Sequence, residues 1–183
     1  MNFFNLNRQY KLINQKIFKS LSINFKNCDF IQGKNVKALE KYLLKFSKSK
    51  YCLSCANGTD ALRIALNAIN IPKNSYVIVP SYTWISTASS VVESGMKPIF
   101  CDVDENDYLI SVEKINETLK FAKKNKMNVK AIITVDLFGN PVDYKKISKL
   151  CKKNKIFFIS DAAQSFGSKH LRNYIGTYLC DIM

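Results

Sequence analysis

Apolar residues recur along this chain at two spacings, one typical of helices and one typical of buried strands. Intervals of three and four residues predict amphipathic helices at 7–24, 34–47, 59–70, 84–94, 112–125 and 143–153. Short apolar runs predict strands at 50–55, 76–79, 98–101, 130–135 and 156–160. From residue 50 onward strands and helices alternate, and this alternation implies an α/β fold with three layers, in which helices cover both faces of a mainly parallel sheet.

Single residues mark several boundaries of the predicted helices. Ser111 and Asp143 precede two helices and are typical N-cap residues, whereas Gly95 follows a helix and is typical of a C-terminal stop. No Gly/Ser-rich or Pro-rich linker and no internal repeat divides the 183 residues, so they are predicted to form one unit.

The composition is that of an ordinary globular protein, with 47% hydrophobic and 23% charged residues. The start of the chain, residues 1–8, has no long apolar stretch behind a basic head, so no signal peptide is predicted. No later segment is apolar enough to span a bilayer. We therefore expect a cytoplasmic protein that is not bound to a membrane.

The formal net charge of +14 makes nucleic-acid binding an alternative to consider. The lysines cluster within 120–130 and 145–155, on the polar sides of predicted amphipathic helices. No arginine-rich arm, helix-turn-helix pattern, zinc finger or aromatic RNA-binding motif accompanies them. We interpret them as solvated faces and expect no nucleic-acid partner, although a positive surface also favours an anionic substrate.

Two acidic or cysteine-containing motifs raise the question of a metal or redox site. Cys52 and Cys55 form a CxxC pair, but it lies in a predicted strand, and no second pair of ligands exists. Asp102 and Asp104 resemble the metal motif of nucleotide-sugar glycosyltransferases, yet they run into a turn-forming sequence that ends at Asp107 and explains them better. No metal site is predicted.

Polar residues that suit a ligand site follow several of the predicted strands. Asn57, Gly58 and Thr59 open a helix whose first N–H groups and dipole would suit a phosphate. Asp161 ends an apolar strand, where it could cap a helix, form a buried salt bridge or face the pyridinium nitrogen of pyridoxal phosphate. Trp84, the single tryptophan, could pack in the core or stack on a heteroaromatic ring. In a parallel sheet these strand ends share one edge.

Six segments, taken in order, resemble the DegT/DnrJ/EryC1/StrS family of sugar aminotransferases. They are Phe4-Asn-Leu-Asn-Arg-Gln-Tyr10, Phe30-Ile-Gln-Gly33, Cys55-Ala-Asn-Gly-Thr-Asp-Ala-Leu62, Val79-Pro-Ser-Tyr-Thr-Trp84, Pro98-Ile-Phe-Cys-Asp-Val-Asp104 and Asp161-Ala-Ala-Gln-Ser-Phe-Gly167. The resemblance implies an aspartate-aminotransferase-like large domain (fold type I), of which residues 1–183 would be the N-terminal part. It also implies pyridoxal phosphate as the cofactor.

The resemblance assigns roles to five residues. Gly58 and Thr59 would hold the cofactor phosphate, and Trp84 would stack on the ring. Asp161 would pair with the ring nitrogen, and Gln164 would bond near the ring hydroxyl. The Schiff-base lysine of the family is expected beyond Met183, because Gly176 and Asp181 match the approach to it; Lys169 precedes that approach. No catalytic residue is therefore assigned, and the chain alone is expected to be inactive.

The function implied is transfer of an amino group, from a donor such as glutamate, to a 3- or 4-keto sugar linked to UDP or dTDP. Such chemistry serves surface polysaccharide or amino-sugar biosynthesis, and family members are homodimers. Two alternatives remain open: a dehydratase of the same family in which another residue replaces the lysine, and a non-catalytic binding or regulatory protein on the same scaffold.

Overall fold

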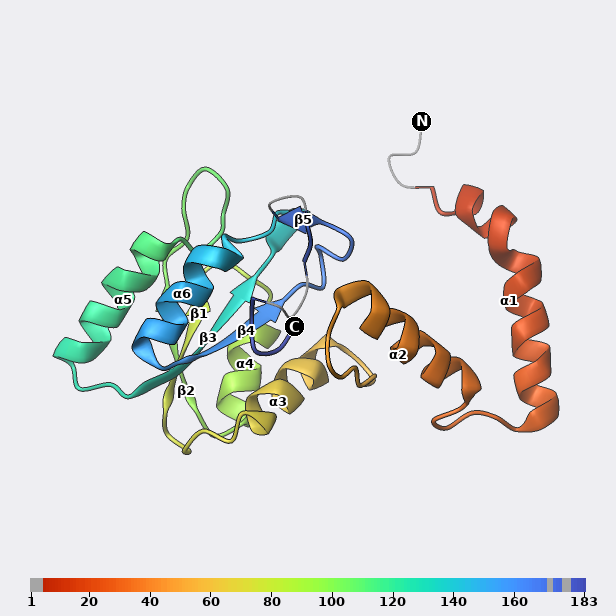
Figure 1. Ribbon diagram of the computed structural model, residues 1–183, viewed down its shortest axis with the longest axis horizontal. Helices are drawn as coiled ribbons and strands as arrows, with labels where there is room; N and C mark the ends of the chain where they lie inside the picture. Colours follow the sequence, from red (N-terminus) through yellow and green to blue (C-terminus); the bar gives the residue numbers. More distant parts are fainter. Residues whose placement is uncertain (1–4, 171–172, 176–178) are drawn as a thin grey trace. The chain divides into compact units, whose positions relative to one another are not determined.

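A computed structural model of the chain describes residues 5–170, 173–175 and 179–183 (Figure 1). The chain folds as two compact units, one ending at Tyr42 and the other running from Leu43 to Met183, where the sequence predicted one. Within the described ranges, none of the helices combines the length and the apolar character needed to cross a membrane.

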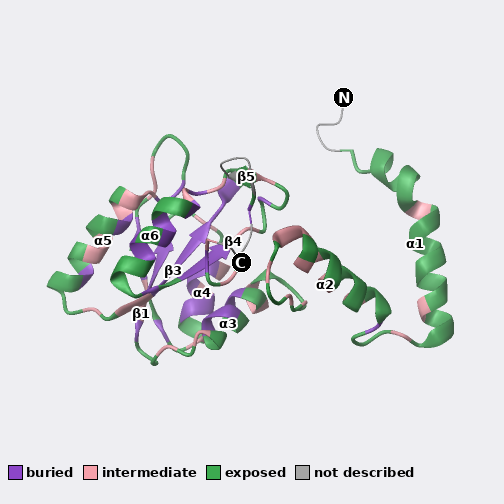
Figure 2. Ribbon diagram, viewed as in Figure 1, coloured by how far each residue is buried: buried purple, intermediate pink, exposed green. Residues whose placement is uncertain are grey.

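The first unit contains helix α1 (Asn7–Asn27) and most of helix α2 (Lys34–Ser47). The Asn35 amide of α2 donates hydrogen bonds of 3.2 Å to Ser20 and Asn24 of α1. Helix α1 buries none of its residues, and in Figure 2 it is mostly green with a few pink, half-exposed positions. The apolar side predicted for it is therefore present but exposed, at Tyr10, Ile13, Ile17 and Leu21.

The second unit is built on a parallel sheet of four strands in the order β2-β1-β3-β4. The strands are β1 (Tyr76–Pro80), β2 (Lys97–Cys101), β3 (Val129–Val135) and β4 (Phe157–Asp161). Ile182 forms a parallel bridge with Ile159 of β4. The prediction of a parallel sheet is confirmed.

Helices cover both faces of this sheet, which gives the predicted three layers (Figure 1). The helices are α3 (Gly58–Ala68) and α4 (Ser86–Glu93) on one face, and α5 (Val112–Lys124) and α6 (Tyr144–Asn154) on the other. Alternate strand residues point to opposite faces. Val77, Ile133 and Ile159 pack with α3 and α4, whereas Ile78, Ile132 and Phe158 pack with α5 and α6.

The predicted boundary residues act as expected. The Ser111 hydroxyl accepts a hydrogen bond of 3.2 Å from the Lys114 N–H, and the Asp143 carboxylate accepts one of 3.1 Å from the Lys146 N–H. Gly95 follows α4 with a φ of +79°, a left-handed conformation that favours glycine. Three short elements were not predicted: the 3₁₀ turn η1 (Leu137–Gly139) and strands β5 (Lys169–His170) and β6 (Asn173–Tyr174).

The strand predicted at 50–55 is wrong, because these residues form no strand. The side chains of Tyr51 and Leu53 are 88% and 71% exposed, so the apolar residues of this segment do not enter the core. The segment contains no β-branched residue, and the four strands of the sheet pair with one another without it. The helix predicted from residue 84 begins two residues later, at Ser86.

Candidate functional site

The five residues predicted to bind a cofactor line one cavity of about 300 Å³ in the second unit. The cavity lies where β3 and β4 end and where α3 and α4 begin. It is lined by Gly58, Thr59, Leu62, Thr83, Trp84, Ser86, Thr87, Val135, Asp161, Ala163 and Gln164. Four chain segments that are distant in the sequence therefore meet at the carboxyl edge of the sheet, as expected for a ligand site in a parallel α/β fold.

One wall of the cavity is the start of α3. Asn57 is its N-cap, in an extended conformation, and its side chain accepts a hydrogen bond of 2.9 Å from the Asp60 N–H. A Cβ built on Gly58 would meet no atom within 4 Å, so open space lies in front of this glycine. The first N–H groups of a helix have no acceptor within the helix and carry partial positive charge. This wall therefore suits an anion such as phosphate.

A second helix start, that of α4, adjoins the first. The hydroxyls of Thr59 and Ser86 are 2.8 Å apart and link the two helix ends. Ser86 was not predicted as a site residue, because the helix was expected to begin at residue 84 and Ser86 would then have been an interior position. Ser81 and Thr83, two residues common in turns and loops, follow β1 and were the signal in the sequence for a longer loop.

Trp84 lies in the loop before α4 and is 75% exposed. This exposure excludes the alternative that its indole packs in the core. An exposed indole that lines a cavity offers a flat face on which a ring can stack.

Asp161 is the last residue of β4, and its carboxylate lines the cavity. One carboxylate oxygen accepts a hydrogen bond of 3.1 Å from the Ala163 N–H, which belongs to a turn and not to a helix. Among the described residues, no lysine or arginine forms an ion pair with Asp161. Within the part of the chain that the structure describes, Asp161 therefore takes neither of the two structural roles that the sequence left open, a helix N-cap or a salt bridge.

The side chain of Gln164 is held at the edge of the cavity by the loop after β3. Its Oε1 accepts a hydrogen bond of 2.7 Å from the Phe138 N–H. Phe138 has a φ of +57°, a conformation rare for a residue with a side chain. With the amide oxygen directed at the Phe138 N–H, the NH₂ group of Gln164 can donate to a ligand.

A fully buried carboxylate, Asp136, lies directly after β3, where its side chain contacts Tyr144 of α6 and does not line the cavity. It accepts hydrogen bonds from the Tyr144 hydroxyl (2.7 Å), the Ser165 hydroxyl (2.7 Å) and the Val142 N–H (3.0 Å). Burial raises the pKa of Asp136 above its ordinary value, although these donors oppose the shift. Burial likewise raises the pKa of Tyr144 far above its ordinary range.

The other motifs do not contribute to this cavity. Asp104 accepts hydrogen bonds from the backbone and side chain of Asn106, which confirms the predicted turn. In the part of the chain that the structure describes, no cluster of three metal-binding side chains occurs and no disulfide forms. Burial raises the pKa of the Cys151 and Cys180 thiols to about 12, so both stay protonated at neutral pH.

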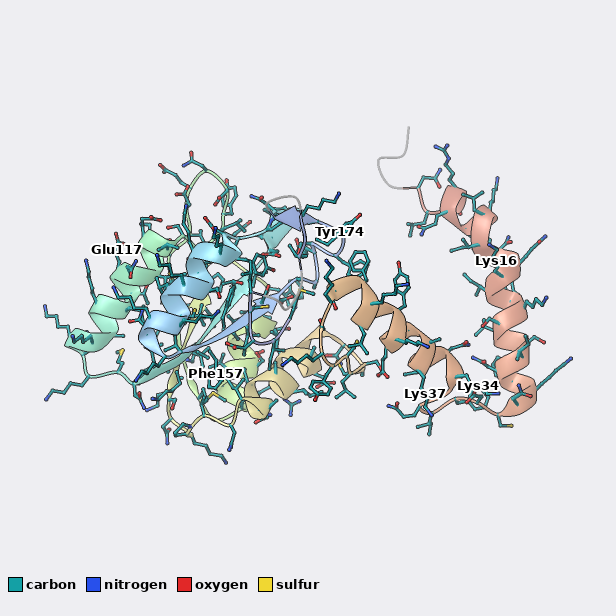
Figure 3. The ribbon with its side chains drawn as sticks, in the orientation of Figure 1. Lys16, Lys34, Lys37, Glu117, Phe157 and Tyr174 are labelled. Atoms are coloured by element: carbon teal, nitrogen blue, oxygen red, sulfur yellow. The ribbon has the colours of Figure 1, made fainter. Side chains whose placement is uncertain are left out.

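Lysines lie on exposed helix sides, as predicted. Figure 3 shows Lys16 on α1 and Lys34 and Lys37 on α2 projecting from their helices. The lysines of α5 and α6 are also exposed, except Lys114, which is half-buried and lies 3.8 Å from Asp102.

A parallel α/β sheet with two helix starts, an exposed indole and a carboxylate at its carboxyl edge defines a class of protein that binds small anionic ligands at that edge. The chain belongs to one family within this class, the DegT/DnrJ/EryC1/StrS aminotransferase family, whose model matches residues 11–181.

Two curated relatives show the range of names in this family. The UDP-2-acetamido-2-deoxy-3-oxo-D-glucuronate aminotransferase of Pseudomonas aeruginosa is 34% identical over 180 residues, which cover 98% of this chain and 47% of the relative. The pleiotropic regulatory protein of Geobacillus stearothermophilus is 32% identical over 171 residues, which cover 93% and 44%. The chain thus spans about half the length of these relatives.

Solved structures confirm the fold. A DegT DnrJ EryC1 StrS aminotransferase from Brucella abortus has a TM-score of 0.91 and 34% identity, with 96% of this chain and 48% of that one covered. The Bacillus subtilis protein NtdA with bound cofactor PMP has a TM-score of 0.84 and 26% identity, with 96% and 39% covered. The three-layer architecture of the type I aminotransferase fold, present in part, is therefore confirmed.

Proposed function

We propose that this chain forms the cofactor-binding part of an aminotransferase that uses pyridoxal phosphate and acts on nucleotide-linked keto sugars. One observation carries the proposal: Gly58, Thr59, Trp84, Asp161 and Gln164, chosen from separate motifs, line a single cavity. Family membership and the names of the relatives support the reaction and the substrate class.

The residues of the cavity fit the cofactor group by group. The open space in front of Gly58, at the start of α3, has room for a phosphate. The exposed Trp84 indole can stack on the ring, and the Asp161 carboxylate can accept a hydrogen bond from a protonated ring nitrogen. The amide NH₂ of Gln164 can donate to the ring hydroxyl oxygen.

Bound pyridoxal phosphate would supply an electron sink for bond changes at the carbon that carries the amino group. The chain's own residues would prepare this chemistry. Asp161 would keep a proton on the ring nitrogen, because a carboxylate close to that nitrogen favours its charged form. The two helix starts would fix the phosphate and thereby the orientation of the ring.

We further propose that residues 1–183 are the N-terminal part of the large domain, since the chain covers about half of each relative. The lysine that moves the proton would then follow Asp181. Lys169 does not take this role, because its ammonium lies over the Tyr174 ring, 4.8 Å from the centroid, and does not line the cavity. Gly176, the other residue used to place the lysine, lies outside the described residues.

The complete protein would take glutamate as the amino donor, act as a homodimer in the cytoplasm, and serve surface polysaccharide or amino-sugar biosynthesis. Position 3 or position 4 of a UDP- or dTDP-linked keto sugar would be aminated. The likeness to the P. aeruginosa relative, whose name describes a 3-oxo sugar, favours position 3.

A second candidate is a protein that binds the cofactor or a sugar nucleotide without transferring nitrogen. The identity of 32% to a relative named pleiotropic regulatory protein favours it. A dehydratase of the same family would instead remove a hydroxyl group from the sugar.

An assay with nitrogen-labelled glutamate tests these functions. The full protein product that carries this chain would be incubated with pyridoxal phosphate, labelled glutamate, and 3-keto or 4-keto nucleotide sugars. We expect label in the sugar, detected by mass spectrometry, and none without the cofactor. Loss of a sugar hydroxyl without gain of nitrogen, or unchanged sugars, would overturn the aminotransferase proposal in favour of the dehydratase or the binding protein, respectively.

A further inference from the structure

The carboxylate of Asp136 does not line the cavity, yet it is bonded to the turn that carries three cavity residues, Asp161, Ala163 and Gln164. Asp136 directly follows β3, and its backbone N–H donates to the Asp161 carbonyl at 3.1 Å. Val135 and Asp161 are register partners and both line the cavity, whereas the Asp136 side chain meets Tyr144 of α6. The Asp136 side chain therefore lies outside the cavity, next to residues that line it.

Besides the backbone bond from Asp136 to Asp161, two side-chain bonds join the turn at the end of β4, residues 161–165, to the loop after β3. Gln164 Oε1 accepts the Phe138 N–H at 2.7 Å. The Ser165 hydroxyl donates to Asp136 Oδ2 at 2.7 Å. Ser165 is 1% exposed, so water does not compete for this bond. One of the bonds that hold this turn, the one between Ser165 and Asp136, therefore lies outside the cavity.

The same carboxylate oxygen has a second hydroxyl partner that does not belong to the turn. The Tyr144 hydroxyl donates to Asp136 Oδ2 at 2.7 Å and lies 2.5 Å from the Ser160 hydroxyl. Substitutions of Tyr144 and Ser165 are therefore a matched pair, because each removes one hydroxyl donor from Asp136 Oδ2. Only the substitution of Ser165 removes a bond that holds the turn.

We propose that Asp136 is a positioning residue of the site, which fixes the Asp161–Gln164 turn through the Ser165 hydroxyl. The inference rests on the proposed function, since the cofactor is the ligand that the turn would hold. Asp136 does not touch that ligand. It determines how well the Asp161 carboxylate meets the ring nitrogen, and hence both the affinity for the cofactor and the protonation of its ring.

The test uses pyridoxamine phosphate, which carries the ring and phosphate and binds without a lysine. Its affinity would be measured by calorimetry for the full protein product that carries this chain and for its Ser165→Ala, Tyr144→Phe and Asp136→Asn variants. The pH at which the bound ring nitrogen loses its proton would be read from the ultraviolet absorbance of the ligand. Urea unfolding would give the stability of each variant.

We expect Ser165→Ala to weaken binding by about tenfold and to lower the pH at which the ring loses its proton. Tyr144→Phe should reduce stability but change affinity by less than about twofold. If Asp136→Asn folds, combining it with Ser165→Ala should weaken binding no further than either change alone. If Asp136→Asn does not fold, the comparison of Ser165→Ala with Tyr144→Phe tests the positioning role without it.

Equal losses of affinity in Ser165→Ala and Tyr144→Phe, or a ring titration that moves in neither, would overturn the positioning role and leave a purely structural network. An unmodified chain that folds but does not bind pyridoxamine phosphate would instead overturn the proposed function, and the inference with it. The two failures are thus distinguished by the behaviour of the unmodified chain.

Discussion

An aspartate stands at the carboxyl end of β3 and another at the end of β4, and the two have opposite surroundings. Asp136, outside the cavity, is fully buried and accepts hydrogen bonds from three protein donors. Asp161, at the front, is partly exposed in a cavity and accepts one such bond, from Ala163. The first carboxylate is satisfied by the protein itself, whereas the second retains acceptor capacity for a ligand. The comparison separates a residue that should matter for stability from one that should matter for binding.

The largest effect is expected from removing the buried carboxylate. Asp136→Ala removes three buried hydrogen bonds; it leaves the Val142 N–H without its acceptor, while the Tyr144 and Ser165 hydroxyls keep Ser160 and the Ala162 carbonyl as partners. Since each buried hydrogen bond contributes about 1 kcal/mol and an unsatisfied group costs about 1–3 kcal/mol, we expect the free energy of unfolding to fall by about 3 kcal/mol. Urea unfolding measures it, with Asp161→Ala as the matched control at the front of the sheet. A smaller loss in Asp136→Ala than in Asp161→Ala would break the comparison.

The next effect concerns the front carboxylate. Asp161→Asn removes the charge that would face the ring nitrogen and should weaken binding of pyridoxamine phosphate by roughly 10- to 100-fold, because a charged hydrogen bond contributes about 1.5–3 kcal/mol. In the complete enzyme, turnover should fall further. Stability should change by less than about 1 kcal/mol. Asp102→Asn, an exposed carboxylate after β2, is the control and should leave binding unchanged. Undiminished affinity in Asp161→Asn would exclude Asp161 as the ring partner.

A smaller effect is expected at the phosphate wall. A methyl group at Gly58 would occupy the open space at the start of α3 without touching the protein. Gly58→Ala should therefore weaken binding by about fivefold or more while raising the free energy of unfolding by up to about 1 kcal/mol, because alanine favours the helix. Calorimetry and urea unfolding on the same samples measure both quantities. A variant that binds as tightly as the unmodified chain would show that the phosphate does not lie at Gly58.

The smallest effect is a dependence of stability on pH. Because burial raises the folded-state pKa of Asp136 above its ordinary value of 3.8, its contribution to the free energy of unfolding is fully present below about pH 3.8. That contribution is lost as the pH rises through the folded pKa. Asp104 has the opposite sign, since hydrogen bonds from Asn106 lower its pKa.

Urea unfolding between about pH 4 and pH 7 measures this dependence. Asp136→Asn should lose the part of the pH dependence that Asp136 contributes, while Asp104→Asn should retain it. An identical pH profile in Asp136→Asn and the unmodified chain would contradict the assignment.

The amino-acid sequence predicts the sheet well because its strands are short apolar runs followed by polar residues. It fails at 50–55, where apolar residues such as Tyr51 and Leu53 stay exposed, because a strand requires a neighbour and the sequence does not state which strands pair. The five residues proposed for the site were chosen because they follow strand ends or helix starts and match the motifs of the family, and the structure brings them to one cavity.

The network around Asp136 could not be predicted from the sequence. Its donors lie six, eight and 29 residues further along the chain, and no spacing rule links them. The sequence also could not predict whether Trp84 is exposed, since a single tryptophan suits a core as well as a cavity. Both features depend on how the elements pack, which the pattern along one chain leaves undetermined.

Fluorescence of Trp84 tests the central claim, that the five predicted residues form one cofactor site. Because Trp84 is the single tryptophan and lines the cavity, its emission reports binding there without a label. Titration of the 183-residue chain with pyridoxamine phosphate should give saturable quenching. Asp161→Asn and Gly58→Ala should shift the curve to higher ligand concentrations. Absence of quenching in a folded chain, or curves that coincide for all three proteins, would contradict the account.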